Sequence, residues 1–248
     1  MIFFKSGHRP GFAKYLITIR NCFFQKSFPN CEKNLQKFFL IAGTQKLKNY
    51  VEIGVGYTIT DFLVLEHFFE FETAHLTDLN YLFCPRTYAA SMLLNPNNYA
   101  SSVFQNNLAF LFNLLIFGHV KLRKKNILYT TEDAVLMEFP GNSFIYSNAV
   151  LEHLPPDSID QFISHISESK PALFGGIVDT NDHLYRSLPK NEQFANYNQS
   201  ALEIQIRGNN VGADQWAQVF RQYFSEVSMD THSIDDELIH NIYVFCCK

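Results

Sequence analysis

The sequence predicts an α/β fold in which a sheet of seven mostly parallel strands, ending in an antiparallel hairpin, carries helices on both faces. Apolar stretches of strand length alternate with helical stretches over the first five strands, as expected for parallel βα units. The last two strand-like stretches, 226–233 and 240–246, are separated by a short turn region. Parallel neighbours need a long crossover, so this final pair is predicted to be antiparallel.

The predicted elements follow one another through the rest of the chain. Short apolar runs bounded by turn residues indicate the strands, and apolar residues at helical spacing indicate the helices. Two prolines stand just ahead of the helix at 157–169, where proline is tolerated. The predicted strands are 49–53, 73–77, 126–130, 143–147, 172–178, 226–233 and 240–246, with helices over 60–69, 157–169 and from 214 onward.

Composition and charge exclude several classes of protein. Apolar residues make up 47 % of the 248 residues and charged residues 18 %, a balance that excludes a disordered chain. The formal net charge of −4 shows no overall excess of basic residues of the kind expected for binding duplex nucleic acid, so we expect no nucleic-acid partner. The odd cysteine count and a charge at Lys5, too early for a signal peptide, favour the cytoplasm.

No repeat and no hinge rich in Pro, Gly or Ser divides the chain, so we predict a single domain over 1–248. Residues 1–48 are predicted to form an N-terminal helical extension. Residues 84–125 are predicted to form a helical insertion between the second and third strands. The apolar part of that insertion, 108–118, is about 11 residues against about 20 for a bilayer span, so we expect a buried helix and no membrane insertion.

Polar residues and glycines follow the first two predicted strands. Gly54 and Gly56 end the first strand, and glycine there lets the backbone approach a nucleotide-sized ligand. A dinucleotide fingerprint would need a third glycine where Ile59 stands. Asp78 ends the second strand, where a carboxylate can accept hydrogen bonds from ribose hydroxyls. The alternative for the two glycines is that they only allow a tightly packed turn, and the alternative for Asp78 is an ordinary turn aspartate.

The next two strands also end in polar groups. Glu132 and Asp133 follow the third strand, and Ser147 and Asn148 follow the fourth. A solvent-facing loop explains the acidic pair equally well. However, ligands of open α/β sheets bind at the carboxyl ends of the strands, so four such ends with polar groups predict a nucleoside site at one edge of the sheet.

The order of these segments resembles class I S-adenosylmethionine-dependent methyltransferases, in the branch that acts on small molecules. The resemblance covers about residues 48–248 and implies a Rossmann-like fold. Two departures are Thr58, where a third glycine is frequent, and Ser143, where an aspartate often starts the fourth strand. The matching segments are VEIGVG at 51–56, LTDL at 76–79, EDA at 132–134, SNAVLEHLP at 147–155 and GGIVDTNDH at 175–183.

Carried over by position, the resemblance implies a set of contacts to the cofactor S-adenosyl-L-methionine. It also implies that Glu152 and His153 lie close to the entry of a small-molecule methyl acceptor. The implied contacts are Glu52, Gly54 and Gly56 to the methionine part, Asp78 to the ribose, Leu79 to the adenine face, Asp133 and Ala134 to the adenine edge, and Ser147 and Asn148 near the sulfonium.

Methyl transfer needs few catalytic groups, because the sulfonium is already activated and the protein mainly aligns the acceptor. A base is required only for an acceptor that arrives protonated, and His153 and His183 are the candidates. The alternative for His153 is a purely structural role at the edge of the sheet. Asp179 and Asp182 near His183 also resemble a metal-ligand set, but loop carboxylates more often fix loop shape, so no metal site is predicted.

The resemblance implies a methyltransferase acting on O or N of a small molecule. Two other classes stay open. One is a binding or regulatory protein that keeps the fold without catalysis. The other is an NAD(P)-dependent oxidoreductase, against which the missing third glycine and the terminal hairpin argue.

Overall fold

The structure, a computed structural model, divides into two compact units, residues 1–137 and 138–248. The predicted helices within 1–46 and 81–119, together with Gly56 and Leu79, lie outside the described residues. Whether 1–248 forms a single domain stays a prediction. The residues described are 47–55, 61, 62, 65, 71–78, 120–122, 125–130, 132–185, 188, 191–233 and 240–247.

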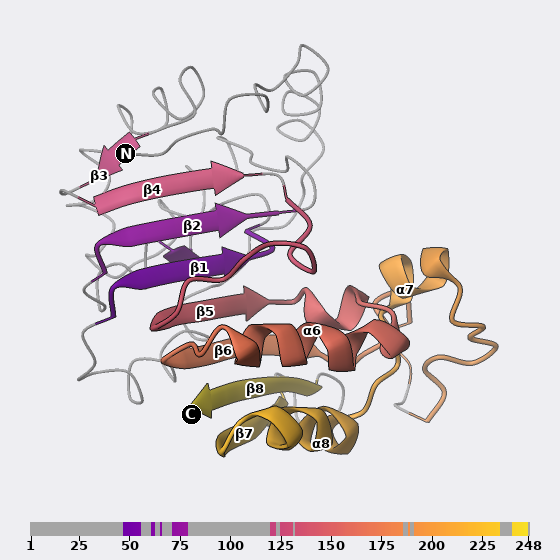
Figure 1. The fold of residues 1–248 in the computed structure, drawn as a ribbon. Coiled ribbons are helices and arrows are strands. Elements are labelled where there is room, and N and C mark those ends of the chain that lie inside the picture. The colour runs from indigo at the N-terminus through magenta and orange to yellow at the C-terminus, as the bar shows by residue number, and fades with distance from the viewer. Residues whose placement is uncertain are drawn as a thin grey trace, which may run out of the picture. The chain divides into compact units, whose positions relative to one another are not determined.

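The first unit contains four described strands in the order β3-β4-β2-β1 (Figure 1). β1, β2 and β4 run parallel, and the short β3 pairs antiparallel with β4 at the edge. The strands are β1 (Asn49–Ile53), β2 (Thr73–Thr77), β3 (Val120–Leu122) and β4 (Lys125–Thr130).

The three parallel strands end in register. Ile53 pairs with Thr77, and Thr77 pairs with Thr130. The residues that follow these strands therefore emerge at one edge, the carboxyl edge of the first unit. Four consecutive residues of β1, from Tyr50 to Ile53, are buried, as expected for a strand covered on both faces.

Aromatic packing holds β1 in place. The ring of Tyr50 stacks on that of Phe71 with centroids 4.9 Å apart, and the ring of Phe62 lies 5.6 Å from that of Tyr50. All three side chains are buried. Such aromatic pairs stabilise a core beyond the area they bury, so the strand that precedes Gly54 is firmly positioned.

The end of the predicted helical insertion is a correction. Residues 120–122 and 125 belong to β3 and β4 rather than to the helical insertion predicted over 84–125. The prediction was wrong at this end because β3 has only three residues, too few for a recognisable strand pattern. The antiparallel pairing of Val120 with Ile127 shows a hairpin instead. Eight strands are present in the described residues, and β3 is the one that was not predicted.

The second unit contains four strands in the order β5-β6-β8-β7. β5 and β6 are parallel, and β8 runs antiparallel to both β6 and β7. Its elements are β5 (Ser143–Asn148), the 3-10 helix η1 (Leu151–His153), α6 (Pro156–Glu168), β6 (Leu173–Asp179), α7 (Ala201–Arg207), α8 (Ala213–Tyr223), β7 (Glu226–Ser233) and β8 (His240–Cys247).

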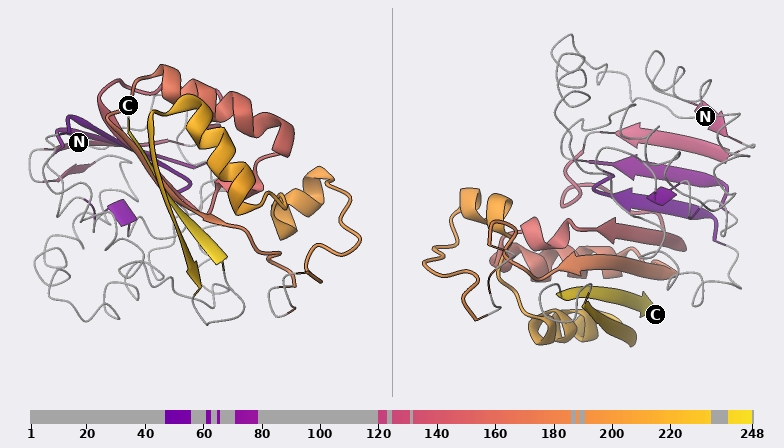
Figure 2. Two further views of the ribbon diagram at one scale, coloured as in Figure 1. Left: turned by 90° about the horizontal axis from the view of Figure 1, so that it is seen from below. Right: turned by 180° about the vertical axis from the view of Figure 1, so that it is seen from behind.

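The helices α6 and α8 lie side by side on one face of this sheet (Figure 2). α6 buries Phe162 and α8 buries Trp216 and Phe220. The ring of Phe220 lies 5.8 Å from that of Phe174 on β6. Among the described residues, no helix combines the length and the apolar character that crossing a bilayer requires.

β5 and β6 approach each other closely at one glycine. Ser147 pairs with Gly176 in the register of the two strands. A Cβ atom at position 176 would collide with the carbonyl oxygen of Ser147. Glycine is therefore required there, and it brings the end of β6 against the residues that follow β5.

Candidate functional site

The chain bends sharply as it leaves β1. Gly54 has a φ of 74°, a left-handed conformation that favours glycine. The N–H groups of Gly54 and Val55 both donate to the carbonyl oxygen of Thr77, at 2.9 and 3.2 Å. Hydrogen bonds thus hold the turn after β1 against the end of β2, where ligands of such sheets bind.

Buried carboxylates meet at this carboxyl edge. Glu52, Asp61 and Asp78 are 3, 6 and 8 % exposed. Burial raises the pKa of Glu52 well above its ordinary value, and the nearby charges of Asp61 and Asp78 raise it further. The hydroxyl of Tyr50 donates to Glu52 Oε2 at 2.7 Å, which acts in the opposite direction. A cluster of three buried carboxylates favours a cationic ligand.

The structure therefore brings together Glu52 and Asp78, which were predicted from strand ends separated in sequence. Asp61 was not predicted. It lies in the stretch where apolar spacing predicted a helix, and an acid at the start of a helix is ordinarily explained by the helix dipole. No sequence signal distinguished it from such an acid.

Asp133 lies in a turn after β4. Its side chain is exposed, and Oδ1 accepts a hydrogen bond from the N–H of Val135 at 3.0 Å. The preceding residue is tied to the sheet, because Thr77 Oγ1 donates to the carbonyl oxygen of Glu132 at 3.3 Å. The loop with Asp133 and Ala134 thus begins beside the end of β2, and Asp133 shapes its turn.

In the second unit, Ser147 and Asn148 end β5. Ser147 is fully buried, and its Oγ makes no hydrogen bond within the described part of the chain. Asn148 is half-buried. Ala149 follows with a φ of 53°, which is uncommon for a residue other than glycine, and its N–H donates to Ile177 at 2.9 Å.

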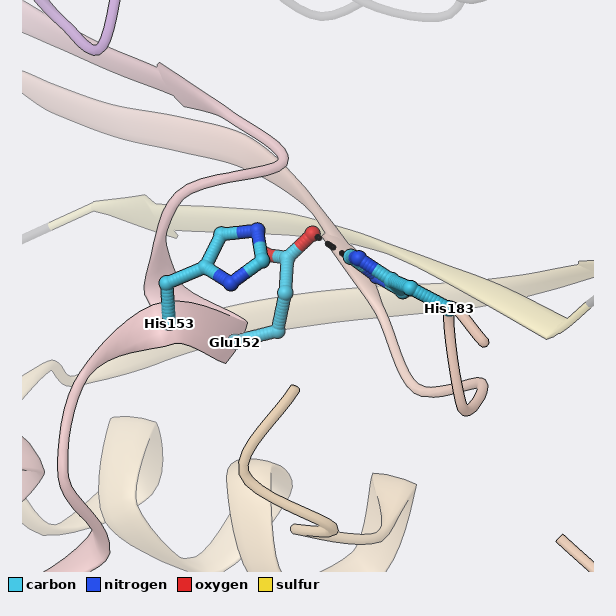
Figure 3. A group of neighbouring side chains, drawn as sticks. All are labelled: Glu152, His153 and His183. Carbon is cyan, nitrogen blue, oxygen red and sulfur yellow. Dashed lines mark ion pairs between the residues drawn. The ribbon is translucent and has the colours of Figure 1, made fainter. Parts of the chain in front are cut away.

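The structure also brings together the two predicted histidines. Glu152 and His153 come from η1, and His183 comes from the loop after β6 (Figure 3). Glu152, 1 % exposed, lies between the two imidazole rings, whose centroids are 5.0 Å apart. The Nε2 of His183 lies 3.9 Å from Glu152 Oε1 and 3.4 Å from Asp179 Oδ2.

A backbone carbonyl orients His153. Its Nδ1 lies 3.2 Å from the carbonyl oxygen of Ile204 in α7. A carbonyl oxygen only accepts hydrogen bonds, so Nδ1 carries the proton and donates it. The lone pair of the neutral ring is then on Nε2, which is the nitrogen able to accept a proton or bind a ligand.

The carboxylates of the loop after β6 fix its shape, as predicted. Asp182 accepts hydrogen bonds from the N–H groups of Leu184 and Phe194, each at 3.0 Å. Asp179 Oδ1 accepts from the N–H and side-chain amide of Asn181, at 3.0 and 2.8 Å. These contacts fix the position of His183.

Arg207, the last residue of α7, pairs with Asp182 in this loop. Its Nε and Nη2 donate to Asp182 Oδ2 at 2.9 and 2.6 Å. Burial acts to raise the pKa of Asp182, but the hydrogen bonds from Arg207, Phe194 and Leu184 outweigh it, and the pKa lies below its ordinary value. Three aromatic rings surround the guanidinium, those of Tyr185, Phe194 and Tyr197.

Comparison with known proteins finds similarity in structure only. No family model matches the chain, and no curated protein matches its sequence. Phosphoethanolamine N-methyltransferase 2 of Haemonchus contortus, solved with S-adenosyl-L-methionine, has a TM-score of 0.55 at 13 % identity. The similarity covers 88 % of this chain and 52 % of that one, so the chain spans about half its length.

Two further solved structures match over most of their own length. N-methyltransferase NodS of Bradyrhizobium japonicum has a TM-score of 0.51 at 12 % identity, covering 88 % of this chain and 96 % of that one. Magnesium protoporphyrin IX methyltransferase of Synechocystis, solved with bound S-adenosylmethionine, has 0.50 at 9 % identity, covering 94 % and 91 %. The chain therefore has the fold of class I methyltransferases.

Proposed function

We propose that this chain is an S-adenosylmethionine-dependent methyltransferase that transfers a methyl group to O or N of a small molecule. One observation carries the proposal. In a chain with this fold, the ends of β1 and β2 lie in register, and the carboxylates of Glu52 and Asp78, one on each strand end, interact. Ligands of such sheets bind at the carboxyl ends of the strands.

The cofactor contacts proposed in the first unit follow from charge and position. Glu52 and Asp61 provide negative charge for the ammonium and sulfonium of the methionine part, beside the turn at Gly54. Asp78 accepts hydrogen bonds from the ribose hydroxyls. Asp133 and Ala134 lie along the adenine, with Gly56 and Leu79 as further contacts. In the second unit, Ser147 and Asn148 are the contacts proposed near the sulfonium.

The chemistry is a displacement at the methyl carbon. The lone pair of the acceptor atom attacks that carbon as the carbon–sulfur bond breaks, and the bonding pair goes to sulfur, which leaves S-adenosylhomocysteine. The protein chiefly aligns the two reactants. When the acceptor is protonated, His153 or His183 takes its proton. The Nε2 of His153 is suited to this, because its Nδ1 is occupied at Ile204.

Titration of the purified full chain with three ligands tests the proposal. We expect S-adenosylmethionine and S-adenosylhomocysteine to bind with one site per chain in isothermal titration calorimetry, and NAD⁺ not to bind. Transfer of labelled methyl from S-adenosylmethionine to a metabolite mixture should follow. Binding of NAD⁺ in preference to both would overturn the proposal. Binding of S-adenosylmethionine without transfer to any acceptor would support the catalytically inactive alternative.

Cofactor affinity should depend on pH through Glu52. Its raised pKa keeps the carboxyl protonated to higher pH, and a cationic ligand favours the charged form. Binding therefore releases a proton, and we expect affinity to rise as pH increases from the ordinary glutamate range toward neutrality, below the ordinary pKa of an α-amino group. In Glu52→Gln this dependence should disappear and binding should weaken at pH 7. Calorimetry in buffers of different ionisation enthalpy counts the protons.

An equal pH dependence in Glu52→Gln and in the unaltered chain would contradict this assignment. The ligand-free protein offers an independent check of sign. The folded state holds the Glu52 proton to higher pH than the unfolded state, so the contribution of this group to stability is present at low pH. It is lost as pH rises through the raised pKa, and Glu52→Gln should remove that loss.

A further inference from the structure

The cluster of Glu152, His153 and His183 has the donor set of a metal site. One ligand atom from each residue lies within 4.8 Å of those of the other two. Two imidazoles and one carboxylate hold zinc in a large class of sites, with the remaining position open to water or substrate. Donor atoms on one ion are about 3.3 Å apart for bonds of about 2.0–2.1 Å, so binding would draw the three side chains together.

The orientation of the side chains independently indicates a ligand. Imidazoles that bind metal ordinarily donate their other N–H to a carbonyl or a carboxylate, which fixes the ring and its tautomer. His153 makes this contact through Nδ1 to Ile204. The Nε2 of His183 is buried, makes no hydrogen bond within the described part of the chain, and points to Glu152 and Asp179.

The charge of the cluster also favours a cation. Glu152 and Asp179 are both buried, and both lie beside His183. With neutral imidazoles the cluster is negative. The other acid of this loop, Asp182, is compensated by the guanidinium of Arg207 at 2.6 Å and is separate from the cluster.

We propose that Glu152, His153 and His183 bind a divalent transition-metal ion of the Zn²⁺ or Mn²⁺ kind. Mixed nitrogen and oxygen donors suit such ions better than Mg²⁺ or Ca²⁺, which take oxygen. Ion binding itself is independent of the cofactor. That the open coordination positions receive an oxygen atom of the methyl acceptor rests on the proposed function, and the acceptor would then be a molecule with a metal-binding oxygen. In the metal-bound form the two imidazoles hold the ion instead of taking the acceptor's proton, so the base role given above belongs to the metal-free form.

The test uses Co²⁺ and Zn²⁺ with the ligand-free full chain. We expect Co²⁺ to develop a visible absorption spectrum at one ion per chain, Zn²⁺ to displace it, and Mg²⁺ not to. His183→Gln and His153→Gln should each weaken metal binding about 100-fold or more. Even the loss of a residue that only hydrogen-bonds to a metal ligand lowers metal affinity about 10–100-fold. His165→Gln is the control, because His165 lies on α6 beside Phe139 and outside the cluster.

Circular dichroism and thermal unfolding verify the fold of each variant, and the half-exposed histidines are preferred to the buried Glu152 for this reason. The proposal is overturned if the unaltered chain binds neither ion. It is equally overturned if His183→Gln binds Co²⁺ as well as the unaltered chain, or if His165→Gln loses as much affinity as the cluster variants. None of these results depends on S-adenosylmethionine, so they leave the proposed function standing.

Discussion

Replacing Arg207 with methionine is expected to cost about 3–5 kcal/mol of unfolding free energy, because it leaves a buried carboxylate without its counterion. Asp182 is fully buried, and two of its hydrogen bonds come from Arg207. The backbone of Arg207 also accepts a hydrogen bond from the N–H of His183 at 3.1 Å. Urea unfolding at pH 7 measures the loss, and Arg221→Met, at an exposed residue of α8, is the control.

The double variant Arg207→Met with Asp182→Asn should recover part of the loss, because no unpaired charge is then buried. The effect should also depend on pH. The pKa of Asp182 is lowered in the folded protein, so the pair stabilises above the unfolded pKa of about 3.9 and this stability is lost as pH falls through the folded value. The difference between Arg207→Met and the unaltered chain should therefore shrink in acid. A constant difference would contradict this explanation.

Replacing Asp78 with alanine is expected to weaken S-adenosylmethionine binding about 100-fold, or about 2.7 kcal/mol. Hydrogen bonds to a charged carboxylate contribute about 1.5–3 kcal/mol each, and a ribose offers two hydroxyls. Stability should not fall in parallel, because the change removes a like charge that raises the pKa of Glu52. Calorimetry gives the affinity, and thermal unfolding of the ligand-free protein separates binding from folding.

The matched control for Asp78→Ala is Glu72→Ala. Glu72 directly precedes β2, whereas Asp78 directly follows it, so the two acids mark opposite ends of one strand. Glu72 is exposed, and its replacement should leave binding unchanged. Equal losses in the two variants would indicate general electrostatics rather than a contact to the ribose.

Much of the fold was accessible from the sequence, because strands buried on both faces have apolar runs of characteristic length. β1, β2 and β7 begin and end where their patterns predicted, and the other predicted strands differ by one residue at one end, or at both ends in β6. The missed elements are short. β3 has three residues among basic ones, and α7 has seven with only Ile204 and Arg207 buried, too few for a periodic pattern.

Site residues at the ends of strands could be predicted from the sequence. Contacts between segments distant in sequence could not. Glu52 and Asp78 were predicted because parallel strands place their ends together. Arg207 was missed, since nothing in sequence links it to Asp182, and so was the approach of Glu152 to His183. Those contacts arise from the way a loop folds back, which residue spacing does not encode.

The carbonyl oxygen of Ile204 accepts from the N–H of Gly208, which ends α7, and also lies 3.2 Å from His153 Nδ1. One oxygen atom thus joins the winding of a surface helix to the tautomer of a site imidazole. Fraying of the last turn of α7 would leave His153 free to exchange its proton between ring nitrogens. Conversely, a ligand bound to Nε2 of His153 would keep the proton on Nδ1 and so raise the free-energy cost of that fraying.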